Sequence, residues 1–325
     1  MSDETVGKPG SYAAWAALDW GNEKHAWALQ SADSEAVEQG QIEATPEAVD
    51  VWAAGLAQRF GGRSVAVALE QARGALLYML AKYEHLVLHP VHPTSLARSR
   101  EAFSPSGAKD DPPDARLLLD YLRRHPERLR PWEPDTPQTR TIQFLAEDRR
   151  TLVDEKTRQT HRLRDRLKLY FPQMVAWFDD LDSPLVEDLL RRWPTLPELQ
   201  KAGPATLRRF FHQHNCRSNE LLEERLQQIR QALPATRDAA VIQAGVSLVK
   251  TLVNQIATLR QGIADFDHQL AELFDQHEDA ALYRSLPQAG PVLAPRLLAA
   301  MGTRRERYQT AAEIQCYSGI APVLE

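Results

Sequence analysis

Four acidic residues near the start of the chain have the type and placement that metal-dependent phosphodiester chemistry requires. Asp19 and Glu70 each directly follow a short apolar run, and Asp111 and Asp114 lie at the start of an apolar-periodic segment. Carboxylate oxygens are the ligands that Mg²⁺ prefers, and two such ions about 4 Å apart can stabilise both the attacking and the leaving oxygen. We predict that four residues are catalytic and together bind two Mg²⁺ ions: Asp19, Glu70, Asp111 and Asp114.

The elements around these acids predict an α/β domain. Short apolar runs are typical of buried strands, and a carboxylate that ends such a strand lies at the carboxyl edge of the sheet, where open α/β folds place their sites. Three hairpin-type strands followed by alternating helices and strands predict a mixed sheet with helices on both faces. The expected strands are 12–20, 24–31, 37–44, 64–69 and 86–90, and the expected helices are 46–59 and 73–83.

Each acid also has a simpler structural interpretation. Asp111 is a plausible helix N-cap with Pro112 at the first helical position, and for this residue alone capping is favoured over catalysis. Asp110 is an alternative to Asp111 as the ligand. Asp114 falls in the first turn, where the helix dipole favours a carboxylate. The joint pattern is more specific, because residues at i and i+3 share one helix face.

A proline-rich boundary separates this domain from a helical region. Residues 138–171 and 235–277 have the pattern of long helices, with shorter helices expected over 184–233 between them. Two long helices with a helical insertion predict an antiparallel or coiled-coil arm that could form a dimer contact. A helix pair within one core is the equal alternative.

Two features of the helical regions could bind nucleic acid. The segment 158–168 has five basic residues and one acid, although the chain has a net charge of −5. A phosphate-binding stripe and a solvated helix face are equally good interpretations. Near residue 290 a helix–turn–helix could direct backbone N–H groups at a phosphate, and a plain helical hairpin is the alternative. The candidate nucleic-acid-binding residues are Arg158, Arg162, Arg166, Lys168 and Gly290.

The composition favours a globular intracellular protein. Hydrophobic residues make up 43% and charged residues 26% of the 325 residues. No run approaches the roughly 18 apolar residues of a membrane span, and no signal peptide is recognisable, so no membrane partner is expected. Cys216 and Cys316 lack metal-ligand spacing, which predicts free thiols in a reducing cytoplasm. Core packing is the expected role of the tryptophans near the first strands, with base stacking by Trp20 as the alternative.

The motifs around the acids resemble those of a known family. Ala17-Leu-Asp19, Leu69-Glu70 and Lys109-Asp-Asp-Pro-Pro-Asp-Ala115 resemble the motifs of DEDD transposases of the insertion-sequence one-hundred-ten family and of the Piv-type DNA invertases. Leu286-Pro-Gln-Ala-Gly-Pro291 and Tyr317-Ser-Gly-Ile-Ala-Pro322 resemble the opening of that family's C-terminal transposase domain.

The resemblance implies a fold and a domain organisation. We expect a flexible tail over 1–10, a RuvC-like, RNase H-type domain over 11–134, a helical coiled-coil region over 135–280, and the beginning of a helical transposase domain over 281–325. The fold class is thus α/β plus all-α.

The resemblance also implies site-specific DNA recombination by a bacterial mobile element, in the cytoplasm and associated with the nucleoid. The expected partners are DNA, an element-encoded guide RNA and further copies of the chain in a dimer or tetramer. A serine nucleophile acts with the acids in this family. Its position lies after the segment that ends at Pro322, so we expect it beyond Glu325 in a truncated chain, and we do not assign the role to Ser318.

Two other functions fit the same residues. The four acids would suffice for a RuvC-like structure-specific nuclease that hydrolyses DNA with water. A non-catalytic nucleic-acid-binding assembly protein with inert acids is the third possibility.

Overall fold

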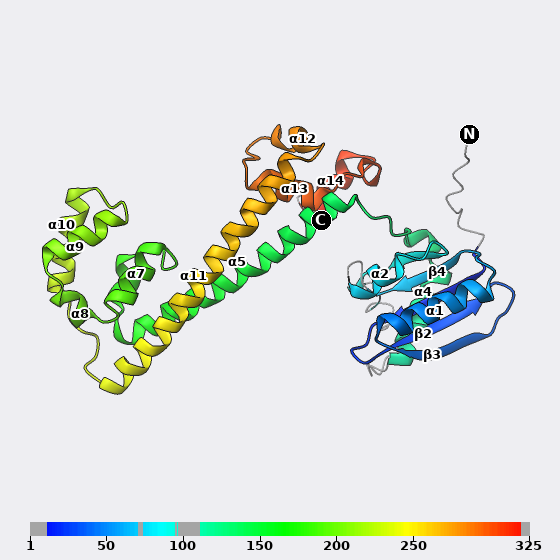
Figure 1. Cartoon of the computed structure of the whole chain (residues 1–325), viewed down its shortest axis with the longest axis horizontal. Helices are drawn as coiled ribbons and strands as arrows, with labels where there is room; N and C mark the ends of the chain where they lie inside the picture. Colours follow the sequence, from blue (N-terminus) through cyan, green and yellow to red (C-terminus); the bar gives the residue numbers. More distant parts are fainter. Residues whose placement is uncertain (1–11, 71–73, 95, 97–110, 320–325) are drawn as a thin grey trace, which may run out of the picture. The chain divides into compact units, whose positions relative to one another are not determined.

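The computed structural model describes residues 12–70, 74–94, 96 and 111–319, with the side chains of 111–113 and 127 excepted. The chain divides into two compact units, residues 1–134 and 135–325 (Figure 1). Each unit is described by itself.

The first unit is built on a five-stranded mixed sheet, as the apolar runs predicted. The strand order is β3-β2-β1-β4-β5. The first strand pairs antiparallel with the second and parallel with the fourth, so β1 is central. The fourth and fifth strands are also parallel, so the carboxyl ends of β1, β4 and β5 share one edge. The strands are β1 (Ala14–Asp19), β2 (Lys24–Ser31), β3 (Val37–Glu43), β4 (Val65–Leu69) and β5 (Leu86–Pro90).

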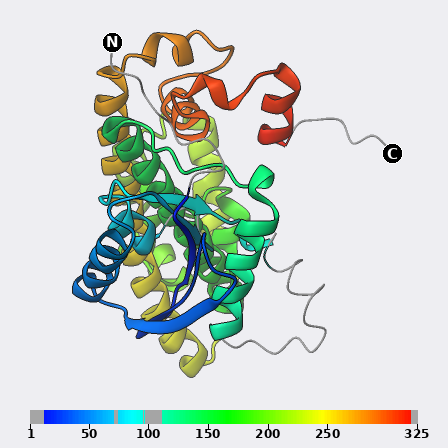
Figure 2. The same ribbon diagram turned by 90° about the vertical axis from the view of Figure 1, so that its right-hand side faces the viewer.

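Helices cover both faces of the sheet, as expected. Helices α1 (Pro46–Arg59) and α2 (Ala75–Leu80) pack on one face, and α4 (Asp111–Arg124) packs on the other (Figure 2). The strands present alanines such as Ala17 and Ala68 to α4, and these small side chains let the helix approach the sheet closely. The helix α4 is therefore held directly against the central strands.

The local signals for helix ends were mostly correct. The Thr45 hydroxyl accepts a hydrogen bond from the backbone N–H of Ala48, so Thr45 caps α1 as predicted. In contrast, α2 is shorter than the expected 73–83. Asp111, the first described residue of α4, is itself helical, whereas the sequence predicted Pro112 as the first helical position. A shift of one residue at a helix end is small.

The second unit is organised around two long helices that pack side by side in opposite directions (Figure 1). They are α5 (Pro137–Tyr170) and α11 (Ala239–Asp275). At one end they enclose a core with α6 (Gln173–Trp177), α7 (Pro184–Arg192), α8 (Leu196–Lys201), α9 (Pro204–Gln213) and α10 (Asn219–Gln231). At the other end they pack with α12 (Ala280–Arg284) and α13 (Leu293–Met301). This unit also contains the short 3-10 helix η2 (Arg305–Arg307) and α14 (Ala311–Ser318), whereas the 3-10 helix η1 (Pro126–Arg128) belongs to the sheet unit.

Between these two cores, specific contacts keep the long helices in register. The Arg149 guanidinium makes a bidentate contact with the Asp267 carboxylate, with N–O distances of 2.5 and 3.0 Å. Gly262 faces the Leu152 side chain, and a β-carbon there would lie 3.3 Å from a Leu152 methyl group. The helices therefore form an extended antiparallel pair with a separate core at each end, and the dimer contact stays a prediction.

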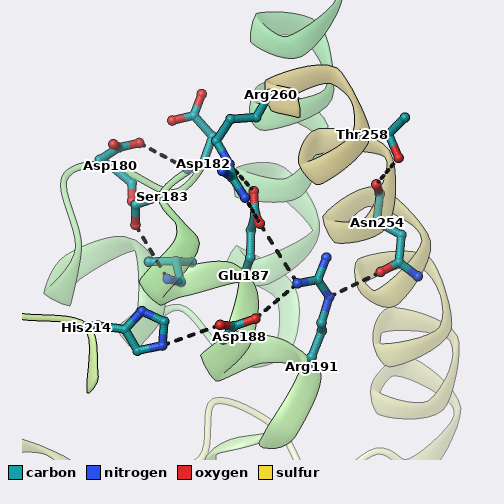
Figure 3. Close-up of polar contacts among 11 residues, drawn as sticks. Asp180, Asp182, Ser183, Glu187, Asp188, Arg191, His214, Asn254, Thr258 and Arg260 are labelled. Atoms are coloured by element: carbon teal, nitrogen blue, oxygen red, sulfur yellow. Dashed lines mark hydrogen bonds and ion pairs between the residues drawn. The ribbon is translucent and has the colours of Figure 1, made fainter. Parts of the chain in front are cut away.

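A buried carboxylate fastens α7 to α11. Glu187 is 2% exposed, and both of its oxygens accept hydrogen bonds from Arg260 on α11, at 3.2 and 2.8 Å (Figure 3). Arg191 lies 3.9 Å from the same carboxylate and also donates to the Asn254 side chain on α11. A buried carboxylate is tolerated only when it is paired in this way.

Helix α11 has the length and composition of a membrane span, which the count of uninterrupted apolar residues did not predict. Polar but uncharged residues such as Gln243, Ser247 and Thr251 interrupt its apolar runs without lowering its mean hydropathy far. The helix packs along α5 and α7, and Val249, Val253 and Ile256 lie in their shared core. This packing accounts for these three residues, whereas 28% of the apolar window as a whole is buried within the described structure.

Two buried histidines of the sheet unit predict acid sensitivity. Burial lowers the pKa of His25 and of His89 below the ordinary value. The unfolded chain then binds protons at a higher pH than the folded chain, so the stabilisation is complete above pH about 6.5 and is lost as the pH falls through the lowered folded-state pKa. In urea titrations at several pH values, we expect His89→Gln to flatten this loss of unfolding free energy. The exposed His92→Gln variant is the control, and an equal flattening by both would contradict the prediction.

Candidate metal and nucleic-acid sites

The sheet brings the first two acids to neighbouring strand ends. The register pairs Leu18 of β1 with Leu69 of β4, and Asp19 and Glu70 are the next residues along these parallel strands. Asp19 is 6% exposed and Glu70 is half-buried. Two carboxylates that are far apart in sequence therefore emerge at the same sheet edge, as the apolar runs predicted.

Side-chain alternation directs Asp19 toward α4. Along β1, Leu18 packs on the face of α1 and α2, whereas Ala17 packs on the face of α4. Successive strand residues point to opposite faces, so Asp19 shares the α4 face with Ala17. Asp114 is 4% exposed on α4, directly before Ala115, which packs in the same cluster as Ala17. Asp19 and Asp114 therefore belong to one layer of the unit.

The fourth acid lies outside what can be described, because the side chain of Asp111 is not among the described residues and Asp110 lies in the segment 97–110. Within the described part of the chain, no three His, Cys, Asp or Glu side chains form a group that could hold a metal ion. The metal site thus stays a prediction, supported by the strand ends and by the layer that Asp19 and Asp114 share. The four carboxylates supply only oxygen ligands, which suits Mg²⁺.

A small pocket lies beside this sheet edge. It is lined by Glu70 and Trp20, by Gly74 and by leucines of β1, β4 and α2. Trp20 is 43% exposed, and its ring packs on His25 with the centroids 4.8 Å apart. The prediction that Trp20 packs in the core was therefore wrong. Trp20 lies outside the sheet, because β1 ends at Asp19.

His25 is a residue of this edge that sequence reasoning missed. Its Nδ1 accepts a hydrogen bond from the backbone N–H of Gly21 at 3.3 Å, which closes the turn after Asp19. Because burial lowers the pKa of His25, the ring is neutral at neutral pH and can accept this bond. The sequence signal was that His25 occupies the same alternate positions of β2 as Trp27 and Leu29.

The basic stretch lies on the last turns of α5. Arg158 and Lys168 each form an ion pair with an acidic residue three positions earlier. Arg162 is exposed and Arg166 is half-buried. Spacing of four residues places Arg158, Arg162 and Arg166 along one side of the helix. Their binding to phosphate stays a prediction.

The salt dependence of DNA binding tests the basic stretch. Each phosphate contact adds about 0.9 to the slope of log affinity against log salt concentration. We expect the variant Arg158→Ala, Arg162→Ala, Arg166→Ala to lower this slope by about 2 or more, measured by fluorescence anisotropy. A variant with Arg208→Ala and Arg209→Ala on α9 serves as the control. An unchanged slope would make the stretch a solvated surface.

The backbone around Gly290 forms its own hydrogen bonds. The Gly290 N–H donates to the Gln288 carbonyl at 2.8 Å, and the Gly290 carbonyl accepts from the N–H groups of Leu293 and Ala294. Gly290 is exposed, but its N–H is used within the turn in this conformation. A phosphate contact at Gly290 remains a prediction and would require another N–H or a change of the turn.

Comparison with known proteins shows which family's sequences this chain resembles. A sequence model of the IS110-type DEDD transposases, described as Transposase, matches residues 16–172. A second, described as Transposase IS116/IS110/IS902 family, matches residues 280–325, and together the two models match more than half of the chain. The first match contains all four candidate acids, and the second contains Gly290.

Individual relatives agree with these matches. A protein named as a mini-circle transposase for IS117 from Streptomyces coelicolor is 27% identical over 264 residues, which are 80% of this chain and 64% of that protein. A protein of insertion element IS116 from Streptomyces clavuligerus is 26% identical over 78% of this chain and 62% of its own length. The chain thus spans less than two thirds of the length of these relatives.

Proposed function

We propose that this chain, which belongs to the IS116/IS110/IS902 family of transposases, acts in metal-dependent DNA recombination by a mobile element. The observation that carries the proposal is the placement of Asp19 and Glu70 at the ends of neighbouring parallel strands, with buried Asp114 on the helix that packs on the same sheet. Carboxylates that converge from separate elements at one sheet edge suit the binding of hard cations.

The proposed chemistry assigns a role to each part of the edge. Asp19, Glu70, Asp111 and Asp114 would hold two Mg²⁺ ions. When bound, Mg²⁺ neutralises charge on the phosphate under attack. The neutral His25 ring and the closed turn at Gly21 hold the chain in place directly after Asp19. We assign the attacking nucleophile to no residue of this chain.

The partners follow from the same proposal. DNA is the substrate, bound in part through Arg158, Arg162, Arg166 and Lys168 on α5. The other proposed partners are an element-encoded guide RNA and further copies of the chain. The proposed location is the bacterial cytoplasm, in association with the nucleoid. The long α5–α11 pair offers an extended surface for contacts between copies.

Calorimetric titration with Mg²⁺ tests the metal site directly. The parent chain should bind Mg²⁺, and Asp19→Ala and Asp114→Ala should each remove most of that binding. Asp120→Ala is the matched control, since Asp120 lies on α4 and pairs with Arg124 at a partly exposed position. Circular dichroism checks that each variant is folded. Equal binding by all four proteins would overturn the proposal.

A further inference from the structure

The last described helices carry an aromatic and basic cluster that the proposed metal site does not use. The rings of Tyr308 and Tyr317 pack with centroids 5.4 Å apart. The Arg307 guanidinium lies 5.8 Å from the Tyr308 centroid and 5.9 Å from the Tyr317 centroid. Tyr317 is 51% exposed, and Arg307 is exposed as well. One arginine therefore lies against both rings, at the surface.

The cluster is held in place by bonds within the unit. The Tyr317 hydroxyl donates to the Ala300 carbonyl of α13 at 2.9 Å. Thr310 caps α14, and the Glu313 carboxylate accepts from the Gln309 backbone N–H at 2.7 Å. Because the Tyr317 hydroxyl already has a partner, its exposed ring face is what remains for a ligand. A ring that is fixed before binding loses little entropy on contact.

The inner ring supports the outer one. The Tyr308 hydroxyl oxygen is buried, which places it on the inner side of the cluster. Tyr308 directly follows η2, whereas Tyr317 lies in the last turn of α14. The two rings therefore come from separate elements and form one surface only in the folded chain.

The segment that carries the cluster is rich in arginine. Residues 296–317 contain four arginines and two glutamates, although the whole chain has a net charge of −5. Arg296 is exposed on α13, one helical turn before the Ala300 carbonyl that anchors Tyr317. Arg305 is engaged with the Asp279 carboxylate. A stacking ring with arginines beside it matches a nucleic-acid base with its phosphate.

We propose that Tyr317, backed by Tyr308 and flanked by Arg307, is a stacking platform for an unpaired base of single-stranded nucleic acid. The inference rests on the proposed function and deepens it, because it names a form of nucleic acid that this part of the chain binds. Base stacking on an aromatic ring tolerates any sequence, since every base has a π-face. Recognition by stacking requires a base outside a duplex, so unpaired strands should bind here and uninterrupted duplex should not.

Fluorescence anisotropy with labelled oligonucleotides tests the platform. The probes are a mixed-sequence single-stranded DNA, an RNA of the same sequence and the corresponding DNA duplex, all measured with EDTA present. We expect Tyr317→Ala to weaken single-strand binding by about tenfold, and Tyr317→Phe, which keeps the ring but loses the bond to the Ala300 carbonyl, to weaken it far less. Duplex binding should be the same for all three proteins. A preference for the DNA or the RNA probe identifies the source of the strand.

A control variant and the presence of EDTA distinguish failure of the stacking platform from failure of the proposed metal site. Phe144→Ala removes an exposed aromatic ring from α5 and should leave single-strand binding unchanged. Equal effects of Tyr317→Ala and Phe144→Ala, or an equal loss with Tyr317→Phe, would overturn the platform. Because EDTA removes Mg²⁺, a failure of the metal site in calorimetry leaves this measurement intact. Binding that depends on Tyr317 then supports the platform even if the metal proposal fails.

Discussion

Replacing Asp19 with asparagine is expected to lower Mg²⁺-dependent DNA cleavage by about 10²- to 10³-fold, because a metal ion contributes several kcal/mol to stabilising the charge of the transition state. Asparagine has the size of aspartate but lacks the negative charge that holds a cation. Asp19 ends the central strand, at 6% exposure, on the sheet face that also carries α4 and Asp114. The measurement is the rate at which water nicks supercoiled plasmid DNA in the presence of Mg²⁺, a reaction that needs the metal site but no nucleophile from the chain.

Asp33→Asn is the matched control for this experiment. Asp33 is an exposed aspartate in the turn between β2 and β3, away from the sheet edge that carries the candidate acids. Urea unfolding of both variants shows whether the sheet unit is intact. Equal nicking rates for Asp19→Asn and Asp33→Asn, with both proteins folded, would exclude Asp19 from the chemistry.

Removing Arg260 is expected to destabilise the helical unit by about 3 kcal/mol, because a buried carboxylate loses its main partner. Glu187 is 2% exposed and receives two hydrogen bonds from Arg260, whereas Arg191 approaches it only to 3.9 Å (Figure 3). In Arg260→Ala, the Glu187 carboxylate would stay buried with this weaker contact alone. Urea titration followed by the helical circular dichroism signal measures the change.

The exposed pair between Arg208 and Glu223 provides the comparison. It is also bidentate, at 2.8 and 2.9 Å, but its side chains are 44% and 57% exposed. Exposed pairs contribute about 0–1 kcal/mol, so Arg208→Ala should change stability far less than Arg260→Ala. A similar loss in both variants would mean that burial of Glu187 does not govern the strength of the contact.

The sequence predicted those structural features that depend on residues close to one another along the chain. The runs before Asp19 and Glu70 predicted two strands because buried strands are short and apolar, and the structure shows that these strands are adjacent and parallel. Thr45 and Pro46 predicted the start of α1, because a cap needs only a hydroxyl and a suitable backbone. The prediction for α2 was too long, since its apolar residues do not define where the helix ends.

The arrangement of the candidate sites needed tertiary structure. Which face of the sheet carries α4 depends on packing of the helix against alanines from three strands, so only the fold assigns Asp19 and Asp114 to one layer. The exposure of Trp20 and the hydrogen bond that engages the Gly290 N–H also depend on how the chain turns after each element. No local pattern encodes these directions.

The sequence by itself determined the acid types, the strands that carry two of them and the helical character of residues 137–275. These properties follow from side-chain chemistry and from periodicity, which act over a few residues. Only the tertiary structure decided that Glu187 is buried against Arg260, and that Arg307 lies against the rings of Tyr308 and Tyr317. Contacts of this kind form when separate elements pack, because close packing selects the side chains that meet.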